Sequence, residues 1–334
     1  MGKDLSINRK VAGKRIFVTG ATGFIGSCLA RRLHEDGAQV IGLEHHPGKG
    51  AELAQGGITV VTGDIADRSR MKEILARGVD IVMHIAAWLR GRPYENYKKF
   101  NIEATRQLAE VCSENGVGRL VFASSIAVYG LHGDADVSEM TPLRLYGDLY
   151  GDSKIMCEQT LTDPSHSWNI ETVIVRPGMV YGPASPGWSI RFARWAKQGI
   201  MPLVDNGNGI AYPIYIDNLI DLLVLCAISP SAANEIYNAV DDGPVTMAQF
   251  LGGYMSMIPT KRCIRMPGRL VQISARWASP LSPGLNLNYV ASQLIGTGKV
   301  SNQKAKTRLS WTPHVSLDEG LRRTERWLRE QGYL

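Results

Sequence analysis

The segment Arg15-Ile-Phe-Val-Thr-Gly-Ala-Thr-Gly-Phe-Ile-Gly26 decides the fold that this sequence predicts. Its first five residues form an apolar run that is typical of a β-strand, and glycine then recurs at every third position. The next residues, Ser27 to Asp36, indicate a helix that Gly37 ends. A strand, a glycine-rich turn and a helix in this order form the βα unit that binds the phosphates of a dinucleotide.

Each glycine of this turn has a separate physical role. The first permits a tight turn, the second lets the backbone approach a pyrophosphate, and the third allows the helix to pack closely on the strand. The N–H groups at the start of the helix, together with the helix dipole, then hold the anion. The turn residues that we expect to border the dinucleotide are Gly20, Thr22, Gly23, Phe24, Ile25 and Gly26.

Length and composition indicate an ordinary globular protein. The chain has 334 residues, of which 44% are hydrophobic and 20% charged, enough for one large or two moderate domains. The net charge is +6, but Lys and Arg are scattered among Asp and Glu. This distribution favours a basic surface that attracts anionic ligands over a nucleic-acid interface.

The cysteine pattern and the apolar runs predict where in the cell the protein is found. The cysteines are dispersed and form no CxxC pair, which favours reduced thiols in the cytoplasm and predicts no metal site. Residues 1–12 read as a loose leader without a secretory signal. The longest apolar run, Leu219 to Ile228, contains Asp221 and is too short to span a bilayer, so it predicts a buried helix. The five cysteines are Cys28, Cys112, Cys157, Cys226 and Cys263.

Strands and helices alternate through the first half of the chain. This alternation is typical of a doubly wound, Rossmann-type parallel sheet with helices on both faces. The predicted strands are 15–19, 39–43, 58–62, 80–85, 120–123 and 172–175, and the predicted helices include 27–36, 69–76 and 101–115.

An acidic residue ends the second predicted strand. Glu44 lies 24 positions after Gly20, where a ribose-binding acid is expected. A carboxylate there accepts hydrogen bonds from the adenosine ribose and repels a 2′-phosphate, so it favours NAD over NADP. The alternative is a solvated charge at the strand end.

Reactive side chains follow the fifth strand. That strand ends in Ser124-Ser125, and the next helix opens with Tyr150 and carries Lys154 on the same face, four residues later. A lysine ammonium near a phenol lowers the phenol pKa and makes it a usable base. A serine at the strand end is then placed to hydrogen-bond the substrate oxygen.

These motifs together resemble those of the extended short-chain dehydrogenases/reductases, the NAD-dependent epimerase/dehydratase superfamily, and the resemblance covers nearly the whole chain. It implies Ser125 as the catalytic serine, with Ser124 as a rival, Tyr150 as the acid/base, and Lys154 as the group that binds the nicotinamide ribose and lowers the tyrosine pKa. The motifs are Thr19-Gly20-x-x-Gly23-x-x-Gly26, Gly63-Asp64-Ile65, His84-x-Ala86-Ala87, Ser125, Tyr150-x-x-x-Lys154 and Arg176-Pro177-Gly178.

The resemblance also implies further cofactor contacts. Asp64 and Ile65 would meet the adenine, Ala86 and Ala87 would border the cofactor, and Pro177 would lie beside the nicotinamide. Tyr129 has two interpretations, a core aromatic or a substrate-side wall, and we favour the core.

The same resemblance implies a domain division and a homodimer. Residues 1–177, with 214–240 returning to them, would form the NAD-binding domain. Residues 178–213 and 241–334 would mainly form a smaller C-terminal α/β substrate domain. Members often dimerise through two helices, here around 101–112 and 150–160.

The sequence departs from the nucleotide-sugar branch of this superfamily at positions that bear on the choice of substrate. Residues 209–213 contain no cation where those members carry an arginine for the substrate diphosphate, and Ser125 is not followed by the acidic pair of dehydratases. Residues 267–277 and 285–295 look like a lid over an apolar pocket, as in the 3β-hydroxysteroid-dehydrogenase-like branch. Alternatively, they close the core of the small domain.

The sequence therefore predicts an NAD-dependent oxidoreductase that interconverts a secondary alcohol and a ketone on a fairly apolar, steroid-like or otherwise lipophilic small molecule. One alternative is a nucleotide-sugar 4-epimerase or related isomerase that retains NAD. An alternative of another class is a regulator that senses the dinucleotide without turnover.

Overall fold

The computed structural model describes residues 11–89, 93–130, 132–166, 168–259, 263–278 and 286–334. Most of the predicted leader, residues 1–12, and the first residue of the predicted lid segment 285–295 lie outside this part of the chain.

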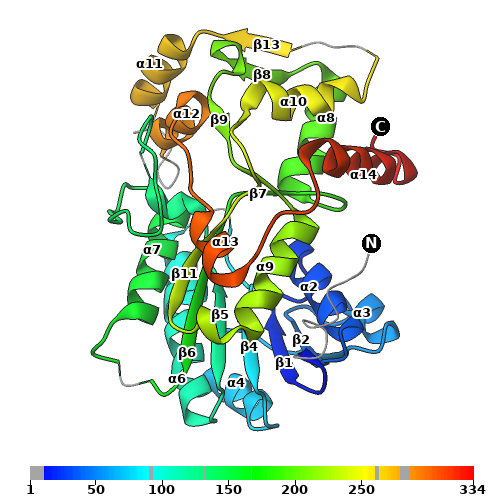
Figure 1. Ribbon diagram of the computed structural model, residues 1–334, viewed down its shortest axis with the longest axis vertical. Helices are drawn as coiled ribbons and strands as arrows, with labels where there is room; N and C mark the ends of the chain where they lie inside the picture. Colours follow the sequence, from blue (N-terminus) through cyan, green and yellow to red (C-terminus); the bar gives the residue numbers. More distant parts are fainter. Residues whose placement is uncertain (1–10, 90–92, 131, 167, 260–262, 279–285) are drawn as a thin grey trace.

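A seven-stranded, all-parallel sheet forms the lower half of the molecule in Figure 1, in the order β11-β6-β5-β4-β1-β2-β3. This confirms the predicted Rossmann-type α/β fold. The strand order reverses between β1 and β4, and such a reversal opens a crevice at the carboxyl ends of the strands. The strands are β1 (Arg15–Thr19), β2 (Gln39–Glu44), β3 (Thr59–Thr62), β4 (Ile81–His84), β5 (Arg119–Ala123), β6 (Glu171–Pro177) and β11 (Glu235–Ala239).

Helices cover both faces of this sheet because successive strand residues point to opposite sides. In β1, Ile16 and Val18 pack with one set of helices, and Phe17 packs with the other. The first set is α2 (Phe24–Glu35), α3 (Ala51–Gln55), α9 (Ile216–Ile228) and α13 (Gln303–Leu309); the second is α4 (Arg68–Leu75), α6 (Ala104–Glu114) and α7 (Leu149–Thr162).

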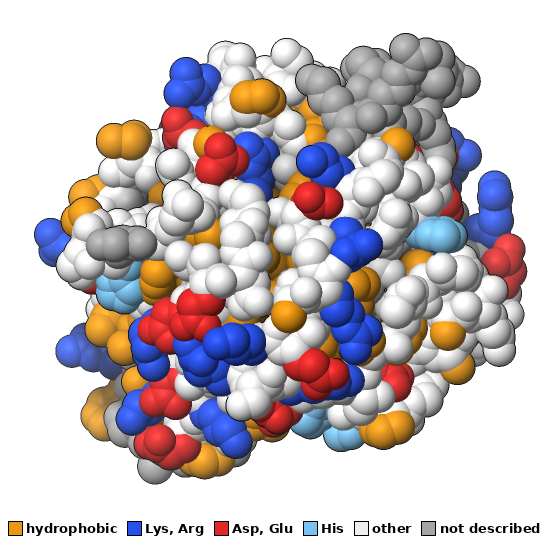
Figure 2. All heavy atoms as spheres, turned by 90° about the horizontal axis from the view of Figure 1, so that it is seen from below, with side chains coloured by type: hydrophobic (Ala, Val, Ile, Leu, Met, Phe, Trp, Pro, Cys, Tyr) orange, Lys and Arg blue, Asp and Glu red, His pale blue; other side chains and the backbone are white. Residues whose placement is uncertain are grey.

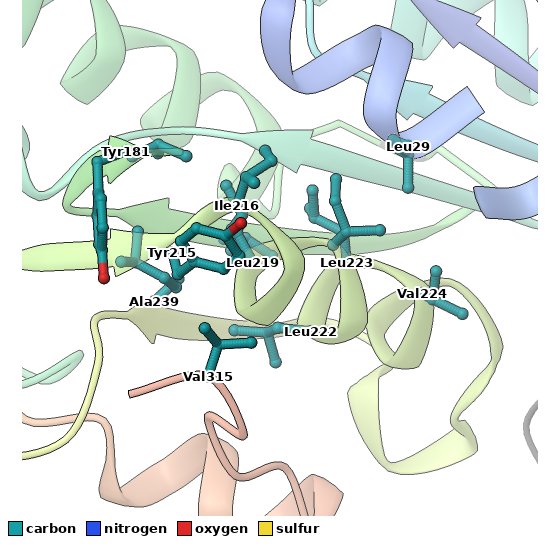
Figure 3. Packing of buried hydrophobic residues seen from close by; sticks show 14 of the residues in the cluster. Leu29, Tyr181, Tyr215, Ile216, Leu219, Leu222, Leu223, Val224, Ala239 and Val315 are labelled. Carbon is teal, nitrogen blue, oxygen red and sulfur yellow. The ribbon is translucent and has the colours of Figure 1, made fainter. Parts of the chain in front are cut away.

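The predicted buried helix at 219–228 is confirmed as part of α9. Figure 3 shows Leu219 and Leu223 of this helix in the core, with Leu29 of α2 on the side of Leu223. The one charge in the run is accounted for: Asp221 Oδ1 accepts from Arg32 Nη1 of α2 at 2.5 Å.

Two predicted helix boundaries are wrong. The helix after the glycine turn begins at Phe24, not at Ser27, because Gly23 takes an extended conformation and the helix follows at once. The helix predicted for 101–115 begins earlier, after Pro93. It runs as α5 (Tyr94–Tyr97), a π-helical segment (Lys98–Glu103) and α6, a change of hydrogen bonding that apolar periodicity does not reveal.

Short strand pairs and helices form the upper half of Figure 1. An aromatic cluster that includes Tyr181, Phe192, Phe250 and Tyr254 packs among them. The pairs are β7 (Met179–Tyr181) with β10 (Pro213–Tyr215), β8 (Met201–Val204) with β13 (Cys263–Met266), and β9 (Ile210–Ala211) with β12 (Val245–Thr246). The helices are α8 (Arg191–Gln198), α10 (Met247–Ser256), α11 (Gly268–Ala278), α12 (Leu287–Ile295) and α14 (Leu317–Glu330).

Several single turns complete the described chain. They are a π-helical turn at Pro186–Ile190 and 3₁₀ turns at Ile126–Tyr129, Asp205–Gly207 and Pro230–Ala232. Within the described residues, no helix is long and apolar enough to cross a bilayer. All five cysteines are free thiols.

Candidate active site

The glycine turn brings β1, β4 and α2 into close contact. Gly20 has φ +67°, and a Cβ there would lie 2.9 Å from the Ala86 backbone. A Cβ on Gly26 would lie 2.1 Å from the Gly20 carbonyl oxygen. Any side chain at these positions would push the strands and the helix apart.

The start of α2 fits the pyrophosphate of a dinucleotide. Its N-cap is Gly23, so no side chain caps the N–H groups of the first turn. These N–H groups are an anion site of the kind that helix N-termini provide. Phe24 and Ile25 contribute their backbone to this turn while their side chains pack against the core.

Glu44 is fixed beside this turn, at the end of β2. Its side chain accepts from the Gly50 N–H at 2.9 Å through Oε2 and from the Thr62 hydroxyl at 2.8 Å through Oε1. These two donors lower the pKa of Glu44 below its ordinary value. The interpretation of Glu44 as a solvated charge is wrong, because the residue is buried and both carboxylate oxygens have partners.

The structure separates the roles of the two serines after β5. Ser124 is buried and donates to Glu158 Oε1 at 2.5 Å, and Glu158 in turn pairs with Arg176 at 2.6 Å. Ser125 accepts from the Ala127 N–H at 3.1 Å, and its side chain interacts with the Tyr150 phenol and lowers the phenol pKa. Of the two serines, Ser125 is therefore the one beside the tyrosine.

Tyr150 lies in the first turn of α7, just after the N-cap Asp148. Asp148 accepts from the Gly151 N–H at 2.9 Å and so fixes the start of this helix. Desolvation raises the pKa of Tyr150 to about 12, and the hydrogen bond from Ser125 acts in the opposite direction. The phenol is thus protonated at neutral pH.

Lys154 lies one helical turn further, inside the protein. Its Nζ donates to the Ala123 carbonyl at 2.6 Å and lies 4.4 Å from the centre of the Phe122 ring. Burial lowers the pKa of Lys154 to about 8, against the influence of Cys157 and Glu158. Desolvation is the largest influence on the Tyr150 pKa and Ser125 the largest opposing one, so the lowering by Lys154 that the resemblance implies stays a prediction.

His84, at the end of β4, lies in a buried chain of hydrogen bonds. The Thr19 hydroxyl oxygen accepts from the Ile85 and Ala86 N–H groups, so its proton points to His84 Nδ1 at 2.8 Å. His84 Nε2 then carries the other proton and donates to Thr105 of α6 at 3.1 Å. Burial lowers the pKa of His84 to about 3, so the ring stays neutral.

Asn101 is a site residue that our sequence analysis missed. In the π-helical segment, its carboxamide accepts from the Trp88 N–H at 2.7 Å and donates to the Trp88 carbonyl at 3.1 Å. It also donates to Ser153 at 3.0 Å, and Ser153 donates to the Tyr150 carbonyl. A polar amide amid the apolar positions of a predicted helix was the available signal.

Tyr146 was missed as well. Its hydroxyl donates to the Ala127 carbonyl at 2.8 Å, and a Cβ on Gly151 would lie 1.8 Å from that hydroxyl. The ring also contacts Tyr289 of α12, with centroids 4.9 Å apart. Tyr146 therefore contacts the turn after Ser125, the start of α7 and the predicted lid helix α12.

The other predicted residues are placed as follows. Asp64 follows β3 and accepts from the Ala66 N–H at 2.9 Å, and Ile65 packs against the core. Ala87 follows Ala86 after β4, and Pro177 is the buried last residue of β6.

Tyr129 is a core residue, as favoured. Its hydroxyl donates to Asn238 Oδ1 at 2.6 Å and accepts from Arg176 Nη1 at 2.9 Å, and the side chain is buried.

A separate cavity of about 300 Å³ beside β9 and β12 is lined by Tyr212 and Asp241 among others, and none of the predicted site residues lines it.

Comparison with known proteins decides the family. Residues 16–239 match the model of the NAD dependent epimerase/dehydratase family. The chain belongs to this family. Among curated relatives, a 2-alkyl-3-oxoalkanoate reductase of Shewanella oneidensis is 28% identical over 330 residues, covering 92% of this chain and 84% of that protein. A UDP-glucose 4-epimerase of Vibrio cholerae is 28% identical over 324 residues, covering 93% and 94%.

Solved structures share the fold. The epimerase Mth375 of Methanothermobacter thermautotrophicus superposes with a TM-score of 0.80 at 22% identity, covering 98% of this chain and 96% of that one. Family membership, with reductases and epimerases as relatives, identifies the protein as an enzyme of the extended dehydrogenase/reductase type that uses an NAD-type dinucleotide. The alternative of a non-catalytic regulator is set aside.

Proposed function

We propose that this protein is an NAD-dependent oxidoreductase that interconverts a ketone and a secondary alcohol on an apolar small molecule. The observation that carries the proposal is the juxtaposition of Ser125 and Tyr150, with Lys154 buried on the same helix as Tyr150. These three groups lie at the carboxyl end of the parallel sheet, beside the glycine turn that fits a dinucleotide.

Reduction uses these groups in the protonation states that they hold at neutral pH. The dinucleotide, when bound, supplies the hydride. Tyr150, a phenol below pH 12, donates its proton to the carbonyl oxygen as negative charge develops there. Ser125 would orient that oxygen, and Lys154, an ammonium below pH 8, would hold the nicotinamide ribose and stabilise the phenolate that remains.

The preference for NAD rests on Glu44. Gly50 and Thr62 hold its ionised carboxylate in place, and each oxygen keeps a second lone pair that could accept from a ribose hydroxyl, while the charge would repel a 2′-phosphate. Ala86, Ala87, Asp64, Ile65 and Pro177 complete the proposed cofactor site.

The sequence and the relatives support an apolar substrate. Residues 209–213 contain no cation for a substrate diphosphate. The predicted lid helix α12 also contacts the loop before α7, since Asn286 donates to the Tyr146 carbonyl. The relatives named as 2-alkyl-3-oxoalkanoate reductases favour a 3-oxo acid with alkyl chains as the substrate class to test first.

A second candidate is a nucleotide-sugar 4-epimerase that retains NAD. The relative from Vibrio cholerae, which matches along almost its whole length, favours it. In that reaction the hydride returns to the same substrate, so no net NADH forms.

The test follows nicotinamide absorbance with NADH or NADPH and a panel of 2-alkyl-3-oxo acids, hydroxysteroids, apolar ketones and UDP-sugars. We expect oxidation of NADH by an apolar ketone, and a weaker preference for NADH over NADPH in Glu44→Ala. Sugar conversion without net NADH would establish the epimerase instead. A wild type that prefers NADPH would contradict the role of Glu44.

A further inference from the structure

The outer face of α11 exposes large apolar side chains. Leu270, Ile273 and Trp277 are 61%, 55% and 78% exposed. They recur at helical spacing, so they form one stripe along the helix. Surface Leu or Trp residues are common singly, but three in a row on one helix face mark an interaction surface.

The opposite face of α11 is the one that packs on the protein. Gly268 and Ala275 are its buried residues, and their small size lets α11 lie close against its neighbours. The Gly268 N–H donates to Asp205 Oδ1 at 2.6 Å and attaches the start of the helix. The apolar stripe is therefore not a core face left open, because α11 already has its own buried side.

Cations flank the stripe. Arg269 and Arg276 are exposed and lie along the same edge of it, two helical turns apart. The sequence from Gly243 to Leu317 contains no Asp or Glu, while Lys261, Arg262, Arg265, Arg269 and Arg276 follow one another closely within it.

This charge pattern differs from that of the opposite end of the molecule. Figure 2, seen from below, shows basic and acidic side chains interspersed over that face. In Figure 1, α11 lies at the far upper end. A helix with an apolar stripe that contains Trp, bordered by arginines and without acids, has the features of helices that lie in the surface of an anionic bilayer.

We propose that the α11 outer face, formed by Leu270, Ile273, Trp277, Arg269 and Arg276, binds the surface of an anionic lipid membrane. Apolar side chains enter the boundary between headgroups and acyl chains, and the arginines contact lipid phosphates. Charge decides between this partner and a second copy of the chain, because two such faces would bring four arginines together without an acid between them.

The surface is connected to the site. α11 packs on α12, whose Tyr289 contacts Tyr146 in the loop before α7. An apolar substrate dissolved in the membrane would thus reach the protein next to the predicted lid. This consequence rests on the proposed function, whereas membrane binding itself does not.

The test is co-sedimentation of the full chain with vesicles of phosphatidylcholine alone or mixed with phosphatidylglycerol. We expect binding to the mixed vesicles that weakens as salt is raised. Arg269→Gln with Arg276→Gln should lower partitioning about 25-fold, at about fivefold for each arginine near the surface. Leu270→Ser with Trp277→Ser should lower it by about tenfold or more.

Matched controls keep the test specific. Met140→Ser removes an apolar side chain that is 86% exposed in a different loop, and Arg322→Gln removes an exposed arginine of α14; both should bind as the wild type does. Thermal unfolding of each variant verifies folding. The proposal would be overturned if the wild type did not bind to mixed vesicles, or if both α11 variants bound as strongly as the wild type. So would self-association in solution that the Trp277 variant abolishes, since a second copy would then cover this face.

Discussion

At the residue scale, the proposed chemistry depends on Ser125, Tyr150 and Lys154. Tyr150 is half-buried next to Ser125, and Lys154 is held by a backbone carbonyl rather than by the phenol. Tyr150 is therefore protonated at neutral pH, the state that the proposed reduction requires.

Replacing Tyr150 by Phe removes the proton donor and leaves the glycine turn untouched. We expect turnover to fall by about 10²–10⁴-fold, the usual contribution of general acid–base catalysis. Dinucleotide affinity, measured by fluorescence titration, should change little. Tyr94→Phe, at a residue that is 41% exposed, is the control. Full activity in Tyr150→Phe would refute the acid/base assignment.

His84 predicts how stability depends on pH. The folded protein holds this imidazole neutral with a pKa of about 3, against an ordinary value of 6.5. Its contribution to stability is fully present above pH 6.5. This contribution falls by up to about 1.4 kcal/mol per pH unit as pH falls toward 3, because the unfolded chain binds the proton more tightly.

In His84→Gln, we expect the free energy of unfolding to fall by about 1–3 kcal/mol at neutral pH, because hydrogen bonds to Thr19 and Thr105 are lost or weakened. Its decline between pH 6.5 and 4 should be shallower than in the wild type. Urea unfolding at several pH values measures both. The exposed His46→Gln should keep the wild-type slope, and identical slopes in all three proteins would contradict the prediction.

At the element scale, a buried ion pair joins α7 to β6. Glu158 of α7 pairs with Arg176 of β6, with both side chains at most 3% exposed, and Ser124 of the β5 end donates to the same carboxylate. The helix that carries Tyr150 and Lys154 is thereby fixed against the two strands that border it.

Replacing Glu158 by Gln leaves the Arg176 guanidinium buried without a counter-charge. We expect a loss of about 3–5 kcal/mol of folding stability, measured by denaturant unfolding. Glu73→Gln removes one partner of the exposed ion pair with Arg70 and should change stability little. Equal effects of the two substitutions would mean that the buried pair has no special role.

At the scale of the whole molecule, segments far apart in the sequence meet at one edge of the sheet. Ser125, Tyr150 and the glycine turn come together because parallel strands place their carboxyl ends at the same edge. The helices expected to mediate dimerisation, α6 and α7, pack side by side on one face of the sheet.

A homodimer through these helices is a prediction that sedimentation equilibrium tests. We expect the mass of two chains for the wild type. Met156 is a half-buried residue of α7, and Met156→Arg should shift the protein to a monomer because it places a charge in the interface. Met140→Arg, at a residue outside these helices, should remain a dimer. A monomeric wild type would exclude this assembly.

Local patterns alone determined the sheet, the glycine turn and the positions of Tyr150 and Lys154. The turn from Gly20 to Gly26 is recognisable because its constraints lie within a few residues, where only glycine fits the close backbone contacts. The order of the motifs predicted the family of the protein, because each motif is also a constraint within a few residues.

Only the tertiary structure showed that Ser125 rather than Ser124 lies beside Tyr150, which groups Asn101 and Tyr146 bind, and that burial raises the pKa of Tyr150. The chain stays extended just after β5, and adjacent residues of extended chain point to opposite sides, so Ser124 meets Glu158 and Ser125 meets Tyr150. Desolvation and hydrogen bonds come from neighbours far away in the sequence, such as Asn101 and Ser153, which are 52 positions apart. No local pattern records which distant groups surround a side chain, and those groups set its pKa and its role.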